Sequence, residues 1–116
     1  MVIKSHEGIV SGQVFTLYVA LEDDSIIGTC RVRHDGKRHW VTDLHVSESM
    51  RGRGIGSKLL KLATANLDGA VIVSVETNNR NLRSFYRRAG YSHVRGMAIQ
   101  QVYKGEGEEL WLKKSN

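Results

Sequence analysis

One glycine-rich run holds the residues best suited to chemistry, and it reads Arg51-Gly52-Arg53-Gly54-Ile55-Gly56-Ser57. Extended apolar residues precede this run and a helical pattern follows it, so we expect a strand, a tight turn and a helix start. Glycines at a helix start leave backbone N–H groups uncovered by side chains, and such groups bind anions. Arg51, Arg53 and Lys58 add positive charge around them. The run, called the glycine turn below, therefore predicts a phosphate-binding site.

Two well-known phosphate-binding patterns do not fit the glycine turn. A mononucleotide P-loop closes with Gly-Lys-Ser/Thr, whereas this chain has Gly56-Ser57-Lys58. A dinucleotide fingerprint needs a third glycine at the position of Ser57. The pattern Arg/Gln-x-x-Gly-x-Gly/Ala does fit, through Arg51, Gly54 and Gly56.

A second stretch follows in the right order and at the right separation. Asn79 precedes a short helical segment that carries Tyr86, and Gly90 and Tyr91 come after it. With both stretches present, the sequence resembles the GNAT superfamily of acyl-CoA-dependent N-acyltransferases. The resemblance implies one α/β domain over residues 1–116 with a mixed sheet, in which antiparallel strands lead to a central parallel pair that splays apart for coenzyme A, and two main helices. The family usually has two helices after its first strand, and this chain has no room for both before Val14.

The resemblance also implies acetyl-CoA as co-substrate and assigns residues to it. Main-chain groups at the end of the third expected strand would contact the acyl group and the pantetheine arm, and the glycine turn would hold the pyrophosphate. Asn79 would bind the arm from the opposite strand end. The implied coenzyme-binding residues are Leu44, His45, Val46, Arg51, Gly52, Arg53, Gly54, Ile55, Gly56, Ser57, Asn79 and Tyr86. No metal is expected, because the five histidines are scattered without ligand spacing.

Acyl transfer from a thioester to an amine needs a polarised carbonyl, a neutral amine and a proton for the leaving thiolate. Tyr86 matches the family's tyrosine that protonates the sulfur, and the alternative is a tyrosine that only packs in the core. Glu76 is our first candidate for the base, with His45 and Asp43 as alternatives.

Strand alternation bears on these candidates. It places Asp43 and His45 on one face, and it places Trp40, Thr42 and Leu44 on the other. A bulge would change which face points inward.

The elements that must position these residues follow from periodicity. Residues 1–13 are weakly patterned and predict a short strand or a loose arm. We expect strands over 14–21, 26–33, 39–46, 70–75, 91–102 and 110–113, a helix over 53–66, and a second helix that Thr77, Asn78 or Asn79 caps and Gly90 ends. Ile55, Leu59, Leu62 and Ala63 should face the core.

The composition favours a folded domain over a membrane-spanning or disulfide-bonded protein. The chain has 116 residues, 41% of them hydrophobic, which suits one folded domain. No apolar run approaches the ~20 residues of a membrane span, and no apolar leader begins the chain. The single cysteine, Cys30, excludes an internal disulfide, reads as a buried small residue, and favours the cytoplasm.

The sequence thus predicts an N-acetyltransferase that moves an acetyl group from acetyl-CoA to a primary amine of a protein, peptide or small molecule. Two alternatives stay open. The net charge of +5 also suits a small nucleic-acid-binding module, in which Arg51, Arg53, Arg80, Arg83, Arg87 and Arg88 would contact phosphates. A catalytically silent relative that binds coenzyme A is the other. A second subunit would be one way to complete the acceptor groove, so a homodimer is a further expectation.

Overall fold

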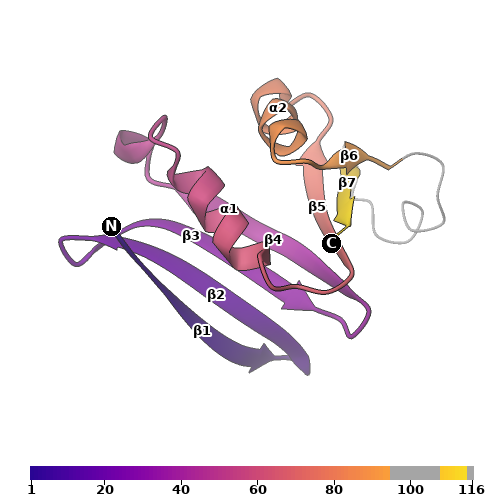
Figure 1. Ribbon diagram of the computed structural model, residues 1–116, viewed down its shortest axis with the longest axis horizontal. Helices are drawn as coiled ribbons and strands as arrows, with labels where there is room; N and C mark the ends of the chain where they lie inside the picture. The colour runs from indigo at the N-terminus through magenta and orange to yellow at the C-terminus, as the bar shows by residue number, and fades with distance from the viewer. Residues whose placement is uncertain (95–107, 115–116) are drawn as a thin grey trace.

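The computed structural model describes residues 1–94 and 108–114. One seven-stranded sheet, in the order β1-β2-β3-β4-β5-β7-β6, carries two α-helices (Figure 1). Along the chain the elements are β1 (Val2–Val10), β2 (Gln13–Glu22), β3 (Ser25–His34), β4 (Arg38–Val46), a 3₁₀ turn η1 (Glu48–Met50), α1 (Ile55–Thr64), β5 (Ala70–Glu76), α2 (Arg80–Arg88), β6 (Ser92–His93) and β7 (Glu108–Lys114).

Strands β1 to β4 form an antiparallel meander, as expected for the three strands after residue 13. Of the two alternatives for residues 1–13, a strand is confirmed and a loose arm is not, but the strand is longer than expected, because β1 pairs with β2 along its whole length from Val2↔Leu21 to Val10↔Gln13. Eight of its nine residues are exposed, so no buried face imposes the alternation that would reveal this strand. A tight turn at Ser11 and Gly12 joins β1 to β2, with φ values of 50° and 78°.

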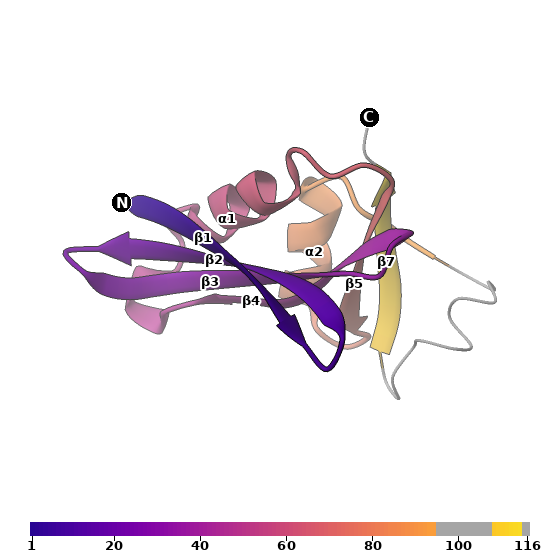
Figure 2. The same ribbon diagram turned by 90° about the horizontal axis from the view of Figure 1, so that it is seen from below.

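The centre of the sheet contains the predicted parallel pair. Strand β5 follows α1 and lies parallel to β4, but the pairing covers only Arg38↔Ala70 to Val41↔Val73. Strand β4 continues to Val46 against β3, and β5 continues to Glu76 against β7. The two strands therefore separate after their fourth pair, and the two halves of the sheet turn in different directions (Figure 2). The predicted splay is confirmed.

Helix α1 begins at Ile55 and ends at Thr64, inside the predicted range of 53–66. Ile55, Leu59 and Ala63 are buried as expected, whereas Leu62 is 49% exposed and Leu60 takes its place in the core. The helix lies very close to β3, because a Cβ placed on Gly28 would lie 2.9 Å from Leu59 Cδ1. A glycine at this strand position therefore sets the depth at which α1 packs.

Helix α2 lies on the same sheet face as α1 and shares one core with it (Figure 1). Asn79 caps α2, and Gly90 ends it with φ 96°, as predicted. A smaller cluster of Trp40, Ile72 and Leu110 lies on the opposite face. No α-helix of the described residues covers that second face, which we call the open face.

The closing strands differ from prediction. Instead of a strand over 91–102, β6 covers only Ser92–His93, and residues 95–102 lie outside the described part. Strand β7 is longer than the predicted 110–113. Among the described residues, no helix has the length and apolar character needed to cross a membrane.

Candidate active site

The glycine turn leaves β4, passes through η1 and opens into α1. Gly52 and Gly54 have φ values of 80° and 79°, a left-handed conformation that other residues adopt at a cost. Gly54 is the N-cap of α1, and no side chain caps its first turn. A Cβ on Gly52 or Gly54 would meet no atom within 4 Å, so the turn faces open space. Uncovered N–H groups at the positive end of a ten-residue helix are suited to a phosphate.

Arg51 is exposed and also has a contact within the protein. Its Nε donates a hydrogen bond to the Val46 carbonyl oxygen at 3.0 Å. The side chain therefore fastens the glycine turn to the last residue of β4. Arg53 and Lys58 are exposed and supply the positive charge around the turn.

A groove of about 850 Å³ runs between the two helices. Ser57, Leu60 and Lys61 line it from α1, and Phe85 and Arg88 line it from α2. Because Ser57 belongs to both the glycine turn and the groove, the two are continuous. A Cβ on Gly56 would lie 3.6 Å from Val46 Cγ2 and 3.7 Å from Phe85 Cε1, so the end of β4 and helix α2 both pack close to this glycine.

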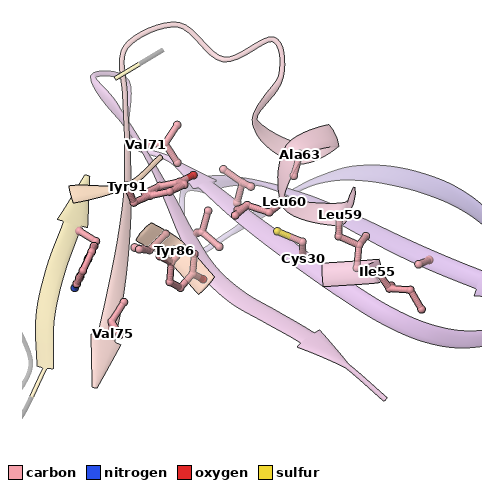
Figure 3. Close-up of a cluster of buried hydrophobic side chains, with 14 of the residues drawn as sticks. Cys30, Ile55, Leu59, Leu60, Ala63, Val71, Val75, Tyr86 and Tyr91 are labelled. Carbon is pink, nitrogen blue, oxygen red and sulfur yellow. The ribbon is translucent and has the colours of Figure 1, made fainter. Parts of the chain in front are cut away.

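Tyr86 is 4% exposed and lies between Phe85 and Tyr91, with ring centroids 5.2 and 5.4 Å away. Figure 3 shows it with Tyr91 and Cys30 in the helix-covered core. Burial raises the pKa of Tyr86 well above its ordinary value, and Cys30, Tyr91 and Asp43 raise it further. The hydroxyl is therefore neutral at physiological pH and can act as a proton donor.

The separated part of β4 carries a bulge that corrects the expected alternation. Val32 pairs with Val41 and Arg31 with Asp43, so Thr42 is the extra residue. As a result Leu44 packs against the helix-covered core, while Trp40 lies on the open face. The expectation that Trp40, Thr42 and Leu44 share a face was wrong for this reason.

Of the implied main-chain contacts, Leu44 and Val46 are half-buried and His45 is exposed. Asp43 is exposed too, yet its charge reaches the helix-covered core, since it raises the pKa of Tyr86. His45 is opposite Thr29 in the sheet. Asp43 is the smallest of the influences that raise the pKa of Tyr86, after burial, Cys30 and Tyr91.

Glu76 and Asn79 lie at the other side of the gap. Glu76 is exposed at the end of β5, and its carbonyl oxygen accepts the Asn79 N–H at 3.0 Å. The Asn79 Oδ1 accepts the Leu82 N–H at 3.0 Å, so the carbonyl end of this side chain caps α2 and its Nδ2 is the end left to donate to a ligand.

The arginine row on α2 consists of Arg80, Arg83, Arg87 and Arg88, and two of these four have contacts within the protein. Arg83 Nε lies 2.7 Å from the buried Glu109 carboxylate, and Arg87 stacks over Trp111 at 5.4 Å. Sequence reasoning missed Glu109, although an acidic residue two positions before Trp111 in a strand indicates a shared face. Of the row, Arg88 lines the helix groove.

A second hollow, of about 340 Å³, opens on the open face. Its lining comes from both sides of the splay: Arg33, Trp40, Val41, Thr42, Ser74, Glu108 and Leu110. Sequence reasoning missed Arg33 and Glu108, because only the pairing of β5 with β7 brings Glu108 to this place. No group of three or more potential metal ligands occurs within residues 1–94 and 108–114.

The mixed sheet, the gap between its parallel strands and the glycine turn define an α/β domain of the acetyltransferase class. The chain belongs to the GNAT acetyltransferase family, because the family model for the acetyltransferase (GNAT) domain matches residues 13–93. The resemblance seen in the sequence is thereby confirmed. No curated protein matches the sequence.

Solved structures share the fold. A GNAT family acetyltransferase from Elizabethkingia anophelis with acetyl-CoA bound has a TM-score of 0.73 and 17% identity, over 97% of this chain and 98% of that one. The PaiA N-acetyltransferase of Thermoplasma acidophilum in complex with coenzyme A has a TM-score of 0.71 and 17% identity, over 87% of this chain and 61% of that one. Naa50 of Arabidopsis thaliana, in complex with the bisubstrate analogue CoA-Ac-MVNAL, has a TM-score of 0.68 and 23% identity, over 85% of this chain and 72% of that one.

Proposed function

We propose that the protein is an N-acetyltransferase that moves an acetyl group from acetyl-CoA to a primary amine. The observation that carries this proposal is the gap between β4 and β5, which opens where β4 leads toward the glycine turn. A thioester arm fits a gap bordered by backbone groups without a strand partner, and a pyrophosphate fits the helix start. The similar structures from Elizabethkingia anophelis and Thermoplasma acidophilum hold acetyl-CoA and coenzyme A, which supports the same ligand here.

In this proposal the coenzyme lies on three parts of the chain. Backbone groups of Leu44 to Val46 contact the acyl group and the pantetheine arm. The N–H groups of the glycine turn hold the pyrophosphate, with Arg53 and Lys58 nearby. Lys61 and Arg88 in the helix groove give further positive charge for the remaining phosphate. Asn79 donates from its Nδ2 to the arm.

Acetyl-CoA supplies an activated thioester, and side chains of the protein donate and accept the protons that the reaction moves. As the amine nitrogen forms a bond to the carbonyl carbon and the bond from carbon to sulfur breaks, Tyr86 gives its phenolic proton to the departing sulfur. Glu76 accepts the proton that the amine loses, with Asp43 and His45 as the other candidates. Proton exchange with solvent then returns Tyr86 and Glu76 to their starting states, so the cycle balances.

Thermal unfolding tests the proposal against the nucleic-acid alternative. A ligand at a hundred times its Kd stabilises the folded state by about 2.7 kcal/mol, so acetyl-CoA should raise the midpoint clearly. A short DNA duplex at the same phosphate concentration should raise the midpoint less, because the charge of Arg83 is already offset by the Glu109 carboxylate. A rise with DNA and none with acetyl-CoA would reverse the assignment.

Labelled acetyl-CoA then separates an active enzyme from a silent relative. Transfer of label to any amine in a panel of peptides, amino acids and polyamines shows activity. Binding of acetyl-CoA without transfer to any of them identifies a silent relative.

A further inference from the structure

The hollow on the open face lies at the mouth of the splay. The last parallel pair is Val41↔Val73, and the next residue on each strand, Thr42 and Ser74, lines the hollow. The helix groove, on the other face, has a separate lining. A molecule in the hollow therefore reaches the gap from the side opposite to the proposed coenzyme.

One wall of the hollow is acidic. The Glu108 carboxylate accepts a hydrogen bond from the Ser74 hydroxyl at 2.7 Å, which fixes its position. Glu76 is directly opposite Glu108 in the sheet and shares its face. No basic side chain within residues 1–94 and 108–114 pairs with Glu108. Glu76 likewise has no ion pair with a described residue, and two neighbouring carboxylates of this kind attract an ammonium group.

The other wall is basic. The Arg33 guanidinium lies 5.2 Å from the centre of the Trp40 ring, and it has no ion pair with any described residue. The ring itself is held in place, because its Nε1 donates to Asp35 Oδ2 at 2.9 Å. Burial alone would raise the pKa of Asp35, but hydrogen bonds from Trp40, Lys37 and Arg38 hold it at about 2. Asp35, which holds the Trp40 ring in place, is therefore ionised at neutral pH.

The two charges occupy different positions along the gap. Arg33 is opposite Trp40, where β4 and β5 are still paired, whereas Ser74 lies just past the last pair. A bound amine would therefore lie at the gap, beside Ser74 and the carboxylates. An anionic group on the same molecule would lie farther back, beside Arg33 and over Trp40 and Leu110.

We propose that this hollow binds the acceptor, and that the acceptor is a small primary amine carrying an acidic group, of the amino-acid type. This inference rests on the proposed function, since it names the substrate class of that reaction. A diamine would bring a second cation against Arg33, and a simple alkylamine would leave Arg33 unpaired. Arg33 is the residue that sets this specificity, and Glu108 positions the amine.

The two tryptophans give a direct binding test. Trp40 lies in the hollow and Trp111 in the helix-covered core, so their indole N–H signals report on different places in an NMR spectrum of the labelled protein. β-Alanine and γ-aminobutyric acid should shift the Trp40 signal in a saturable way and leave the Trp111 signal unmoved. Propylamine, butylamine and putrescine should bind about tenfold more weakly or worse. Equal or tighter binding of the diamine, or no shift at Trp40 with any amino acid, would overturn the inference.

Substitutions of Arg33 and Glu108 test which side chain binds which group of the ligand. Arg33→Gln should weaken amino-acid binding about tenfold and leave alkylamine binding unchanged, and Arg33→Lys should restore part of the loss. Glu108→Gln should weaken both classes of ligand. Lys4→Gln and Glu22→Gln, which remove the same charges at exposed sites, are the matched controls. Arg33→Gln protein that binds amino acids as well as the parent does would contradict the proposed role of Arg33.

Acetyl-CoA is titrated separately, which keeps the two proposals distinguishable. If amino acids shift Trp40 but acetyl-CoA neither binds nor donates its acetyl group, the proposed function fails while the hollow stays a binding site. If acetyl transfer occurs but prefers diamines or peptides, the inference about the acceptor fails and the proposed function stands.

Discussion

Tyr86 has a buried ring and a hydroxyl that stays protonated at physiological pH. Its ring is packed among other aromatic rings in the core, and its hydroxyl is within electrostatic reach of Asp43 on the separated part of β4. Burial and the nearby negative charge both keep the phenol protonated. A neutral phenol can give a proton to a thiolate that forms beside it, but it cannot serve as the base for the amine.

Replacing Tyr86 by Phe should therefore separate folding from turnover. The ring stays in place, so the thermal midpoint and acetyl-CoA affinity should change little, whereas kcat should fall by about a hundredfold. Steady-state kinetics with a saturating amine measures the effect. Tyr18→Phe, at a partly buried tyrosine on β2, is the control and should keep parental kcat. Unchanged turnover in Tyr86→Phe would remove this residue from the mechanism.

Alkaline pH should weaken the fold through the same cluster. Burial raises the pKa of Cys30 from 9.0 to about 12 and that of Tyr91 from 10.0 to about 12. Both groups are neutral in the folded state where the unfolded chain would already ionise. Their contribution to stability is therefore complete below pH 9 and is lost as pH rises from about 9 to 12.

Urea unfolding at a series of pH values measures this loss. Cys30→Ala should be less stable than the parent at pH 7, because it leaves a small cavity, but its stability should fall less steeply above pH 9. Parallel curves for the parent and the variant would show that Cys30 does not contribute to the alkaline loss.

At the scale of elements, the close approach of α1 to β3 depends on Gly28. A Cβ at this position would lie 2.9 Å from Leu59 Cδ1 and 3.1 Å from the His45 carbonyl oxygen. Gly28→Ala should therefore push α1 away from the sheet and destabilise the protein by about 1–3 kcal/mol. Gly8→Ala is the matched control, because Gly8 is also in a strand and a Cβ there meets no atom within 4 Å. Urea unfolding measures the free energy of unfolding of both variants. Equal values for the two would contradict this account of the packing.

Much of this arrangement could be predicted from the sequence. Strong β-formers between turn residues indicated β2, β3 and β4, and the apolar spacing of Leu82, Phe85 and Tyr86 indicated the buried side of α2. Local patterns of this kind report on burial, so they fail where burial is absent. The length of β1 was underestimated for that reason, since almost all of the strand is exposed.

The candidate site was harder to predict than the fold, because its parts meet only through long-range pairing. The bulge at Thr42 moves Leu44 to the face opposite Trp40, and no residue type at this position signals it. Glu108 reaches Ser74 only because β7 lies beside β5. Residue spacing indicated the glycine turn and Tyr86 well, since both belong to continuous segments. It gave no means of choosing between Glu76, His45 and Asp43.

The whole molecule carries a net charge of +5, and much of the proposed coenzyme site is positive. Lys61, Arg88 and Lys113 line the helix groove, beside the exposed Arg53 and Lys58. The Debye length is about 8 Å in physiological salt and shortens as salt is added. Attraction between exposed charges weakens once the Debye length is shorter than the distance between them.

Acetyl-CoA affinity should therefore fall as salt is added, by about tenfold between 50 and 500 mM NaCl. Isothermal titration calorimetry measures how the affinity depends on salt. The control is the same series of titrations with an uncharged osmolyte added in place of NaCl. An affinity that does not change with salt would mean that backbone N–H groups alone hold the phosphates.

The gap between β4 and β5 borders the glycine turn, where the coenzyme is proposed to bind, and the open-face hollow, where the acceptor is proposed to bind. Each reactant then has its own route in and out, so neither has to leave before the other can enter. Under the proposed function, the kinetic scheme is a random sequential one in which both reactants meet in a ternary complex. Double-reciprocal plots should intersect rather than run parallel, and free coenzyme A should compete with acetyl-CoA but not with the amine.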